Sequence, residues 1–227
     1  MQLNLIEEFL LIALDDEEGQ FVIDSTHLYF GFAGAILLEM ALREKIDVSG
    51  DKLKLIHDEY EVEMVINKVI DQINNSKPRK LKTWIEILSK QAKELKEDTL
   101  FGLQNKGILR KEEHKILWII PNNKYPTTDI TPENKVRQRL SDVMLRGAKS
   151  EARDVMLLSL IDVSDLTKEA FRDKEEYKVV KKKIKEVTQE IKISQSVNKS
   201  IREIQAAIMV AMMSAIIVTT TINTSSN

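Results

Sequence analysis

The sequence predicts a mainly α-helical protein, built as one globular domain over residues 1–227 around a buried central helix, with two or more short β-hairpins. Three observations predict this class. Only 7 residues are glycine and 4 are proline while 31% are charged, which is typical of a helix-rich folded chain. Long segments repeat apolar residues at the three- and four-residue spacing of a helix. One segment, residues 31–46, is apolar around almost its whole circumference, as expected of a helix buried on all sides.

The 31–46 segment is expected to be the central helix. Glu39 precedes Arg43 by four residues, so the two side chains can pair on one face among apolar neighbours. Gly31 and Gly34 open the segment, and two interpretations stay open for them. They permit close packing against another helix, or they permit a phosphate to approach the helix start. A glycine pair is a weak motif, so close packing is favoured.

The other elements follow from the same patterns. Asn4 and Glu7 have the spacing of a capping box at the start of the first helix. In chain order we expect helices at 4–14, 61–74, 81–105, 132–145 (with Thr131 as its N-cap), 150–163, 164–190 (with a break near Asp173) and 200–218, a hairpin at 45–56, and a second helix-then-hairpin unit at 103–120 with a polar turn between its strands.

Two further segments complete the prediction. The loop at 121–132, punctuated by prolines, is too polar for a core and is expected to project from the body. The apolar run at 206–218 is too short for a bilayer span, which needs roughly 20 residues. We therefore expect a buried core helix there rather than a membrane anchor, followed by a disordered tail at 219–227.

Composition excludes several classes of function. Zero cysteines exclude disulfides and thiolate zinc sites, and the absence of a secretory leader predicts a cytoplasmic protein. A net charge of -2 argues against a protein that coats nucleic acid over its whole surface. No two of His27, His57 and His114 have helical metal-ligand spacing, and no phosphate loop, dinucleotide fingerprint or nucleophile elbow occurs. The sequence therefore predicts no catalytic residue, no metal site and no cofactor.

The helix expected at 81–105 carries a basic feature. Lys90, Lys93 and Lys96 are three residues apart and share one face. Such a face can meet the phosphates of an anionic bilayer, each charge near the surface giving on the order of 1 kcal/mol. The alternative is a solvated face balanced by the neighbouring carboxylates, and periodicity alone favours it. The balancing residues would be Glu94, Glu97 and Asp98. A second lysine run, residues 177–185, is expected to be the solvated rim of an apolar stripe.

Five blocks of the sequence carry a family resemblance, namely residues 3–19, 31–46, 83–89, 106–109 and 137–140. In this order they resemble the Golgi phosphoprotein family, the phosphatidylinositol 4-phosphate-binding adaptors of the Golgi. They cover nearly the whole chain, and although no single block is diagnostic, five in sequence are fairly specific. The family's long N-terminal extension is missing, which is typical of a minimal or prokaryotic member.

The resemblance implies a mostly helical, non-enzymatic protein that binds a lipid headgroup in a basic surface pocket and pushes a hairpin toward the bilayer. It also implies partners among membrane-protein tails and a second copy of the chain. Lys93 and Lys96 fall where the family has two headgroup-binding arginines, and the candidate headgroup residues are Lys93, Lys96, Lys90, Gly31 and Gly34. The candidate residues of the membrane or oligomer hairpin are Trp118, Ile119, Lys124, Tyr125 and Ile130.

Two positions depart from the family pattern. Asp24 aligns with the pocket tryptophan and Ala33 with a third arginine. Lysine lacks the planar, bidentate grip of arginine on phosphate, and an aspartate repels the headgroup. We therefore expect binding to anionic phospholipid with weakened specificity for phosphatidylinositol 4-phosphate.

The same pattern of elements is also compatible with a second class of function. A helix followed by a short hairpin, twice, is also typical of winged-helix nucleic-acid-binding modules, with residues 81–105 as the recognition helix and the second hairpin as the wing. The near-neutral charge weakens this alternative. The favoured prediction is a peripheral membrane adaptor on the cytoplasmic side of an anionic membrane.

Overall fold

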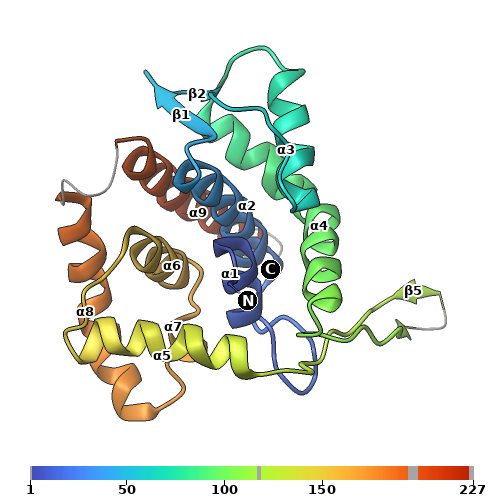
Figure 1. The fold of residues 1–227 in the computed structure, drawn as a ribbon, viewed down its shortest axis with the longest axis vertical. Coiled ribbons are helices and arrows are strands. Elements are labelled where there is room, and N and C mark those ends of the chain that lie inside the picture. The colour runs from blue at the N-terminus through green and yellow to red at the C-terminus, as the bar shows by residue number, and fades with distance from the viewer. Residues whose placement is uncertain (1, 117–118, 194–198, 225–227) are drawn as a thin grey trace.

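The computed structural model describes residues 2–116, 119–193 and 199–224, which fold as the mainly helical body expected from the sequence (Figure 1). The helices are α1 (Leu5–Ile12), α2 (Ser25–Leu42), α3 (Met64–Asn74), α4 (Leu81–Asn105), α5 (Thr131–Leu145), α6 (Ala152–Val163), α7 (Thr167–Ala170), α8 (Lys174–Ile193) and α9 (Lys199–Thr224). The strands are β1 (Ile46–Ser49), β2 (Lys52–Leu55), β3 (Arg79–Lys80), β4 (Lys115–Ile116) and β5 (Ile120–Pro121).

Helix α2 is the centre of the fold, as predicted. It packs against α1, α4, α6 and α9, and its residues from Gly31 to Ala41 are all buried (Figure 1). The helix begins earlier than expected, at Ser25, because the side chain of Asp24 accepts hydrogen bonds from the backbone N–H groups of Thr26 and His27 and caps it.

The two glycines of α2 lie at helix–helix contacts. A Cβ added at Gly31 would lie 2.4 Å from Cζ of Phe9 and 2.5 Å from Oγ of Ser164, and one at Gly34 would lie 2.7 Å from Cδ1 of Ile208. Both glycines therefore allow neighbouring helices to approach α2 more closely than any side chain would permit. Their backbone is inside the core and is not open to a headgroup.

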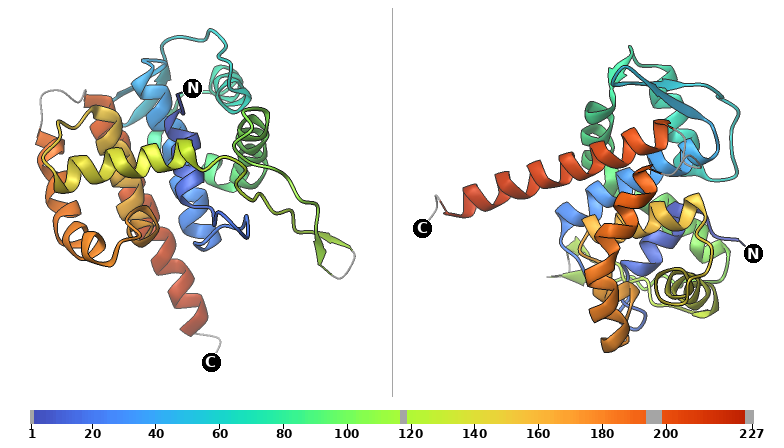
Figure 2. Two further views of the ribbon diagram at one scale, coloured as in Figure 1. Left: turned by 60° about the horizontal axis from the view of Figure 1, so that its bottom comes forward. Right: turned by 90° about the vertical axis from the view of Figure 1, so that its left-hand side faces the viewer.

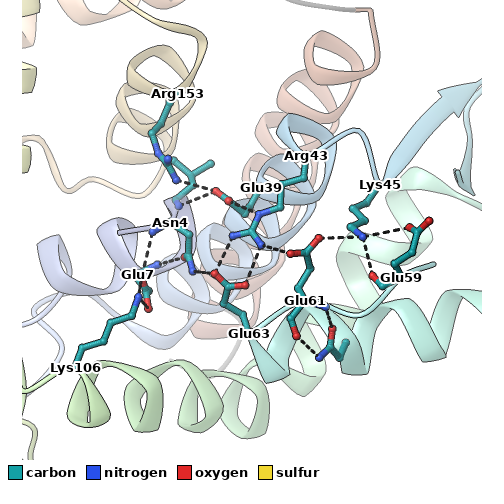
Figure 3. A network of polar contacts seen from close by, with 12 residues as sticks. Asn4, Glu7, Glu39, Arg43, Lys45, Glu59, Glu61, Glu63, Lys106 and Arg153 are labelled. Carbon is teal, nitrogen blue, oxygen red and sulfur yellow. Dashed lines mark hydrogen bonds and ion pairs between the residues drawn. The ribbon is translucent and has the colours of Figure 1, made fainter. Parts of the chain in front are cut away.

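Buried carboxylates of α1 and α2 are paired with cations, one at the end of the same helix and others from distant segments (Figure 3). The predicted pair is confirmed, with Arg43 Nε 2.7 Å from Glu39 Oε1, and the same guanidinium binds Glu63 at 2.9 Å. The capping box of α1 is also confirmed, and its Glu7 is bound by Lys106 of α4 at 2.6 Å. These contacts allow the carboxylates to be buried at tolerable cost.

The first hairpin is confirmed, and α4 has the predicted bounds. Strands β1 and β2 pair antiparallel with Ile46 opposite Leu55 and Val48 opposite Leu53. The two-residue strand β3 adds to the other edge of β2, so the hairpin becomes a three-stranded sheet. A strand this short has no periodicity, so the sequence did not predict it.

The strands of the second hairpin extend further than the sequence predicted. Leu109 pairs with Thr127, Glu112 with Lys124 and Ile116 with Ile120, so residues 110–114 belong to the first strand of the hairpin and not to its turn. A ribbon that projects into solvent has no buried face and needs no alternation of apolar residues. The hairpin projects from the body, and the stretch at 121–127, which we expected to project as a loop, is its returning arm (Figure 1).

The last third of the chain is helical, with two corrections. Ile130 and not Thr131 is the N-cap of α5, and the break expected near Asp173 is confirmed between α7 and α8. Only the first half of helix α9 lies in the core. Its first half is buried at Ile204 and Ile208, but its second half projects from the body and continues to Thr224 (Figure 2). The rest of the expected tail, residues 225–227, lies outside the described part of the chain.

Candidate functional site

The three lysines of α4 lie in different environments. One side of α4 is buried against α2, α3 and α9. Lys90 and Lys93 are exposed, and no carboxylate in the described ranges forms an ion pair with either of them. Lys96 is largely covered, with 12% of its side chain exposed, and it donates to Glu97 at 2.8 Å. The amino group of Lys96 also lies 5.1 Å from the centre of the Phe21 ring, a cation–π contact.

Two of the three neighbouring carboxylates are engaged with residues other than Lys90 and Lys93. Glu97 accepts hydrogen bonds from Lys96 and from the hydroxyl of Tyr125, and Asp98 pairs with Lys68 of α3 at 2.7 Å. Two of the three carboxylates that the solvated-face alternative requires are therefore engaged elsewhere. Glu94 is exposed and remains beside the two exposed lysines, which outnumber it on this part of α4.

The base of the second hairpin is fixed beside these lysines. The backbone N–H of Tyr125 donates to the carbonyl of Gly19 at 2.8 Å, and Gly19 has a φ of +62° and no room for a Cβ against residues 125 and 126. Burial and the hydrogen bond to Glu97 raise the pKa of Tyr125, so its hydroxyl stays a donor. Lys124 pairs with Glu18 at 2.6 Å. The α1–α2 loop, α4 and the hairpin are thus joined at one place.

The predicted hairpin residues are therefore spread over different environments. Ile119 is 81% exposed at the tip, Tyr125 is buried at the base, and Ile130 is half-buried at the start of α5. Trp118 lies outside the described residues. Among the described members of this group, Ile119 alone combines an apolar side chain with the exposure that a contact with lipid or another molecule needs.

The N-terminus of α2 does not carry the charge that an anion-binding site needs. Burial opposes ionisation of Asp24, but hydrogen bonds from His27 and Thr26 outweigh it and lower the pKa of the carboxyl group. Asp24 is therefore negative at neutral pH and occupies the helix N-terminus, where a phosphate would otherwise bind. Ala33 is fully buried in the core. Neither of these two positions supplies a cation, so the positive charge of the site comes from α4.

Sequence reasoning missed a second basic surface. A cleft of about 320 Å³ between the three-stranded sheet and the ends of α3 and α4 is lined by Lys54, Lys77 and Arg79 beside the ring of Trp84. No described carboxylate pairs with these three cations. They come from separate strands and a loop, so no single helix face contains them, but the run from Lys77 to Lys82 holds four cations in six residues and was the available signal.

Comparisons with known proteins agree with the family resemblance drawn from the order of the five sequence blocks. The family model described as Golgi phosphoprotein 3 (GPP34) matches residues 5–204. The chain belongs to the Golgi phosphoprotein 3 (GPP34) family. It is also similar to the vacuolar protein sorting-associated protein 74 of Eremothecium gossypii, with 27% identity over 165 residues, which are 63% of this chain and 49% of that protein. The protein of the same name from Schizosaccharomyces pombe is 25% identical over 165 residues, 63% of this chain and 48% of its own.

Membership in the GPP34 family confirms the resemblance drawn from the five blocks. The chain spans about half the length of these curated relatives. None of these comparisons supports the winged-helix alternative, and α4, which would be its recognition helix, is packed against three other helices. We do not carry the nucleic-acid interpretation further.

Proposed function

We propose that this GPP34-family protein is a non-enzymatic peripheral adaptor that binds anionic phospholipid through the exposed lysines of α4. One observation carries the proposal. Lys90 and Lys93 are exposed and unpaired among the described residues, while two of the three carboxylates beside them, Glu97 and Asp98, are held by Lys68, Lys96 and Tyr125. Unpaired cations on one helix face are attracted to an anionic surface, at about 1 kcal/mol per charge.

The chemistry of the site favours recognition of the negative charge of a lipid over recognition of one particular headgroup. Lys90 and Lys93 are point charges without the planar fork that fits a phosphate bidentately. Asp24 places a negative charge at the start of α2. We therefore propose loose recognition of anionic lipid, phosphatidylinositol 4-phosphate included, on the cytoplasmic side of a membrane. A membrane-bound adaptor of this kind would hold the tails of membrane proteins as its cargo.

Reversing the two exposed lysines is expected to weaken vesicle binding. Lys90→Glu/Lys93→Glu should lower the partition onto vesicles of phosphatidylcholine with phosphatidylserine by at least about tenfold, because four charge units change at the membrane surface. Co-sedimentation over a range of salt concentrations measures this, and binding of the native chain should fall as salt rises. Vesicles that carry phosphatidylinositol 4-phosphate at the same total charge should bind the native chain to a similar extent.

Two matched variants show whether vesicle binding depends on the position of the lysines or on net charge alone. Lys182→Glu/Lys183→Glu makes the same charge change on exposed residues of α8 and should bind nearly as the native chain does. Lys77→Glu/Arg79→Glu tests the basic cleft in the same way. Equal loss in the α4 and α8 variants would contradict the proposal, since it would mean that net charge alone governs binding. Loss only in the cleft variant would move the lipid site to the sheet.

A further inference from the structure

The basic cleft beside the three-stranded sheet has an apolar floor. Leu53 of β2, Ile73 of α3 and Trp84 of α4 line it, and only 2%, 8% and 2% of their surfaces are exposed. Its volume of about 320 Å³ is at the small end of the range for ligand pockets, roughly 300–1,000 Å³. The floor can therefore receive the apolar part of a ligand.

Three cations form the rim of this cleft. Lys54, Lys77 and Arg79 are exposed, and they come from β2, from the loop after α3 and from β3. No carboxylate lines the cleft, and no described carboxylate forms an ion pair with any of the three. An apolar floor inside a positive rim is complementary to a ligand that is both apolar and anionic.

The two acidic residues of the β1–β2 hairpin are engaged with other groups. Asp47 lies opposite Lys54 in the β1–β2 ladder, but it accepts a hydrogen bond from the hydroxyl of Ser200 in α9. Asp51, in the turn, pairs with Lys80 at 2.7 Å. Neither carboxylate forms an ion pair with a cation of the rim, so the three cations remain available to an anionic partner.

The edge of β2 beside the cleft extends beyond its partner strand β3. The N–H of Ile56 donates to the carbonyl of Lys45. Hydrogen-bonded pairs alternate along an antiparallel ladder, so the N–H and carbonyl groups of Leu53 and Leu55 point away from β1. Leu53 lies opposite Arg79 of β3, but β3 contains no residue opposite Leu55, which lines the cleft. An extended chain can therefore pair with β2 at Leu55.

We propose that this cleft binds an extended segment of a partner protein in which acidic and apolar residues alternate. Carboxylates of the segment pair with the three cations of the rim, an apolar side chain covers Trp84, and the backbone pairs with Leu55. Successive side chains of an extended segment point to opposite sides, so alternating residues can serve the rim and the floor in turn.

A peptide fits this cleft better than a free phosphate or a lipid headgroup does. A phosphate offers acceptors to the cations, but it brings nothing apolar to the floor. The acyl chains of a lipid stay in the bilayer, so its headgroup leaves the floor uncovered as well.

The cleft is also separate from the lysines that we propose for lipid binding. At about 1.5 Å per residue, Lys90 and Lys93 lie roughly 9 and 14 Å further along α4 than Trp84. With about 3.6 residues per turn, Lys93 lies on the opposite side of the helix from Trp84. The inference therefore does not depend on the proposed lipid site.

A synthetic peptide tests the cleft directly. A fluorescein-labelled peptide in which glutamate alternates with leucine should bind the full chain, and its fluorescence polarisation should rise as protein is added. The same peptide with lysine in place of glutamate should bind at least about tenfold more weakly, because the charge is reversed. Serine in place of leucine should weaken binding at least about threefold, because the floor stays uncovered. Binding of the acidic peptide should fall as salt rises.

Two charge-reversal variants locate the binding on the chain. Lys77→Glu/Arg79→Glu should bind the acidic peptide at least about tenfold more weakly, because repulsion replaces two charge-assisted contacts. Lys182→Glu/Lys183→Glu makes the same charge change on exposed residues of α8 and should bind the peptide nearly as the native chain does. All four positions are exposed, so both variants should keep the native circular dichroism spectrum.

The outcomes separate a peptide from the other anions that the cleft could hold. An acidic peptide that binds no better than its lysine counterpart, or that both variants bind equally weakly, would overturn the inference. Displacement of the peptide by inorganic phosphate, more strongly than by sodium chloride of equal ionic strength, would indicate a phosphate site and overturn it. Loss of vesicle binding in Lys77→Glu/Arg79→Glu, with Lys90→Glu/Lys93→Glu unaffected, would assign the cleft to lipid and contradict both proposals. Loss of peptide binding in the cleft variant alone, with vesicle binding lost in the α4 variant alone, would support each proposal separately.

Discussion

Replacing Arg43 by alanine is expected to lower the free energy of unfolding by about 3–5 kcal/mol, because it leaves buried carboxylates without their counter-charge. Nε of Arg43 lies 2.7 Å from Glu39, whose side chain is almost fully buried, and both Nη atoms lie 2.9 Å from Glu63 (Figure 3). Arg153 and the backbone N–H of Leu5 also bind Glu39, so part of its stabilisation remains. Urea denaturation followed by circular dichroism measures the loss.

An exposed arginine provides the matched control. Arg146 pairs with Asp142 at i and i+4 on the surface of α5, and about half of the Arg146 side chain is exposed. Removing a surface pair of this kind costs about 0–1 kcal/mol. If Arg146→Ala and Arg43→Ala were equally destabilising, the buried network would not be the reason for the effect.

Acid should weaken the native protein through the same contact. The hydrogen bonds from Arg43 lower the pKa of Glu63 to about 2, against an ordinary value of 4.5. The unfolded chain therefore takes up this proton at a higher pH than the folded chain, so the stability that Glu63 contributes is present above pH 4.5 and is lost as the pH falls toward 2. Arg43→Ala should show a flatter decline of unfolding free energy over this range. An unchanged pH profile would contradict the assignment.

The elements that the sequence predicts well are those with a strong apolar period. The uniform apolarity of α2, the stripe of α4 and the alternation of β1 and β2 each depend on burial, and each element was found, although α2 runs from Ser25 to Leu42 and not over 31–46. The Glu39–Arg43 pair was equally predictable, because its spacing within one helix fixes the distance between the side chains.

The segments that the sequence mispredicts are those that leave the core. The apolar run of α9 has the composition of a core helix, and only the packing of the fold shows that the described residues 213–217 lie outside the core. The second hairpin was mispredicted for the opposite reason, because its exposed strand is polar and not apolar. Its polar strand was interpreted as a turn, because an exposed strand carries no apolar alternation.

The candidate site was predictable in one part and not in others. Exposure of Lys90 and Lys93 follows from helical period, and this was available from the sequence. The covering of Lys96 by Phe21 and Glu97, and the burial of Tyr125, depend on contacts between segments far apart in the chain. Such contacts are set by the fold as a whole and have no local signature.

Replacing Gly31 by alanine is expected to lower the free energy of unfolding by about 1–3 kcal/mol. Alanine favours an exposed helix over glycine by about 1 kcal/mol, so propensity alone predicts the opposite sign. The added Cβ would overlap Phe9 on one side and Ser164 on the other, at 2.4 and 2.5 Å, and both neighbours belong to the packed core around α2. Thermal and urea unfolding of the variant measure the change.

The same substitution at Gly102 is the control. There an added Cβ would meet only an oxygen of Glu7 at 4.0 Å, so Gly102→Ala in α4 should raise the unfolding free energy by about 0.5–1 kcal/mol. Opposite signs for one chemical change show that packing decides the effect at Gly31. A headgroup role for Gly31 predicts something different, namely weaker vesicle binding with unchanged stability, so parallel co-sedimentation of the two alanine variants separates the two interpretations of this glycine.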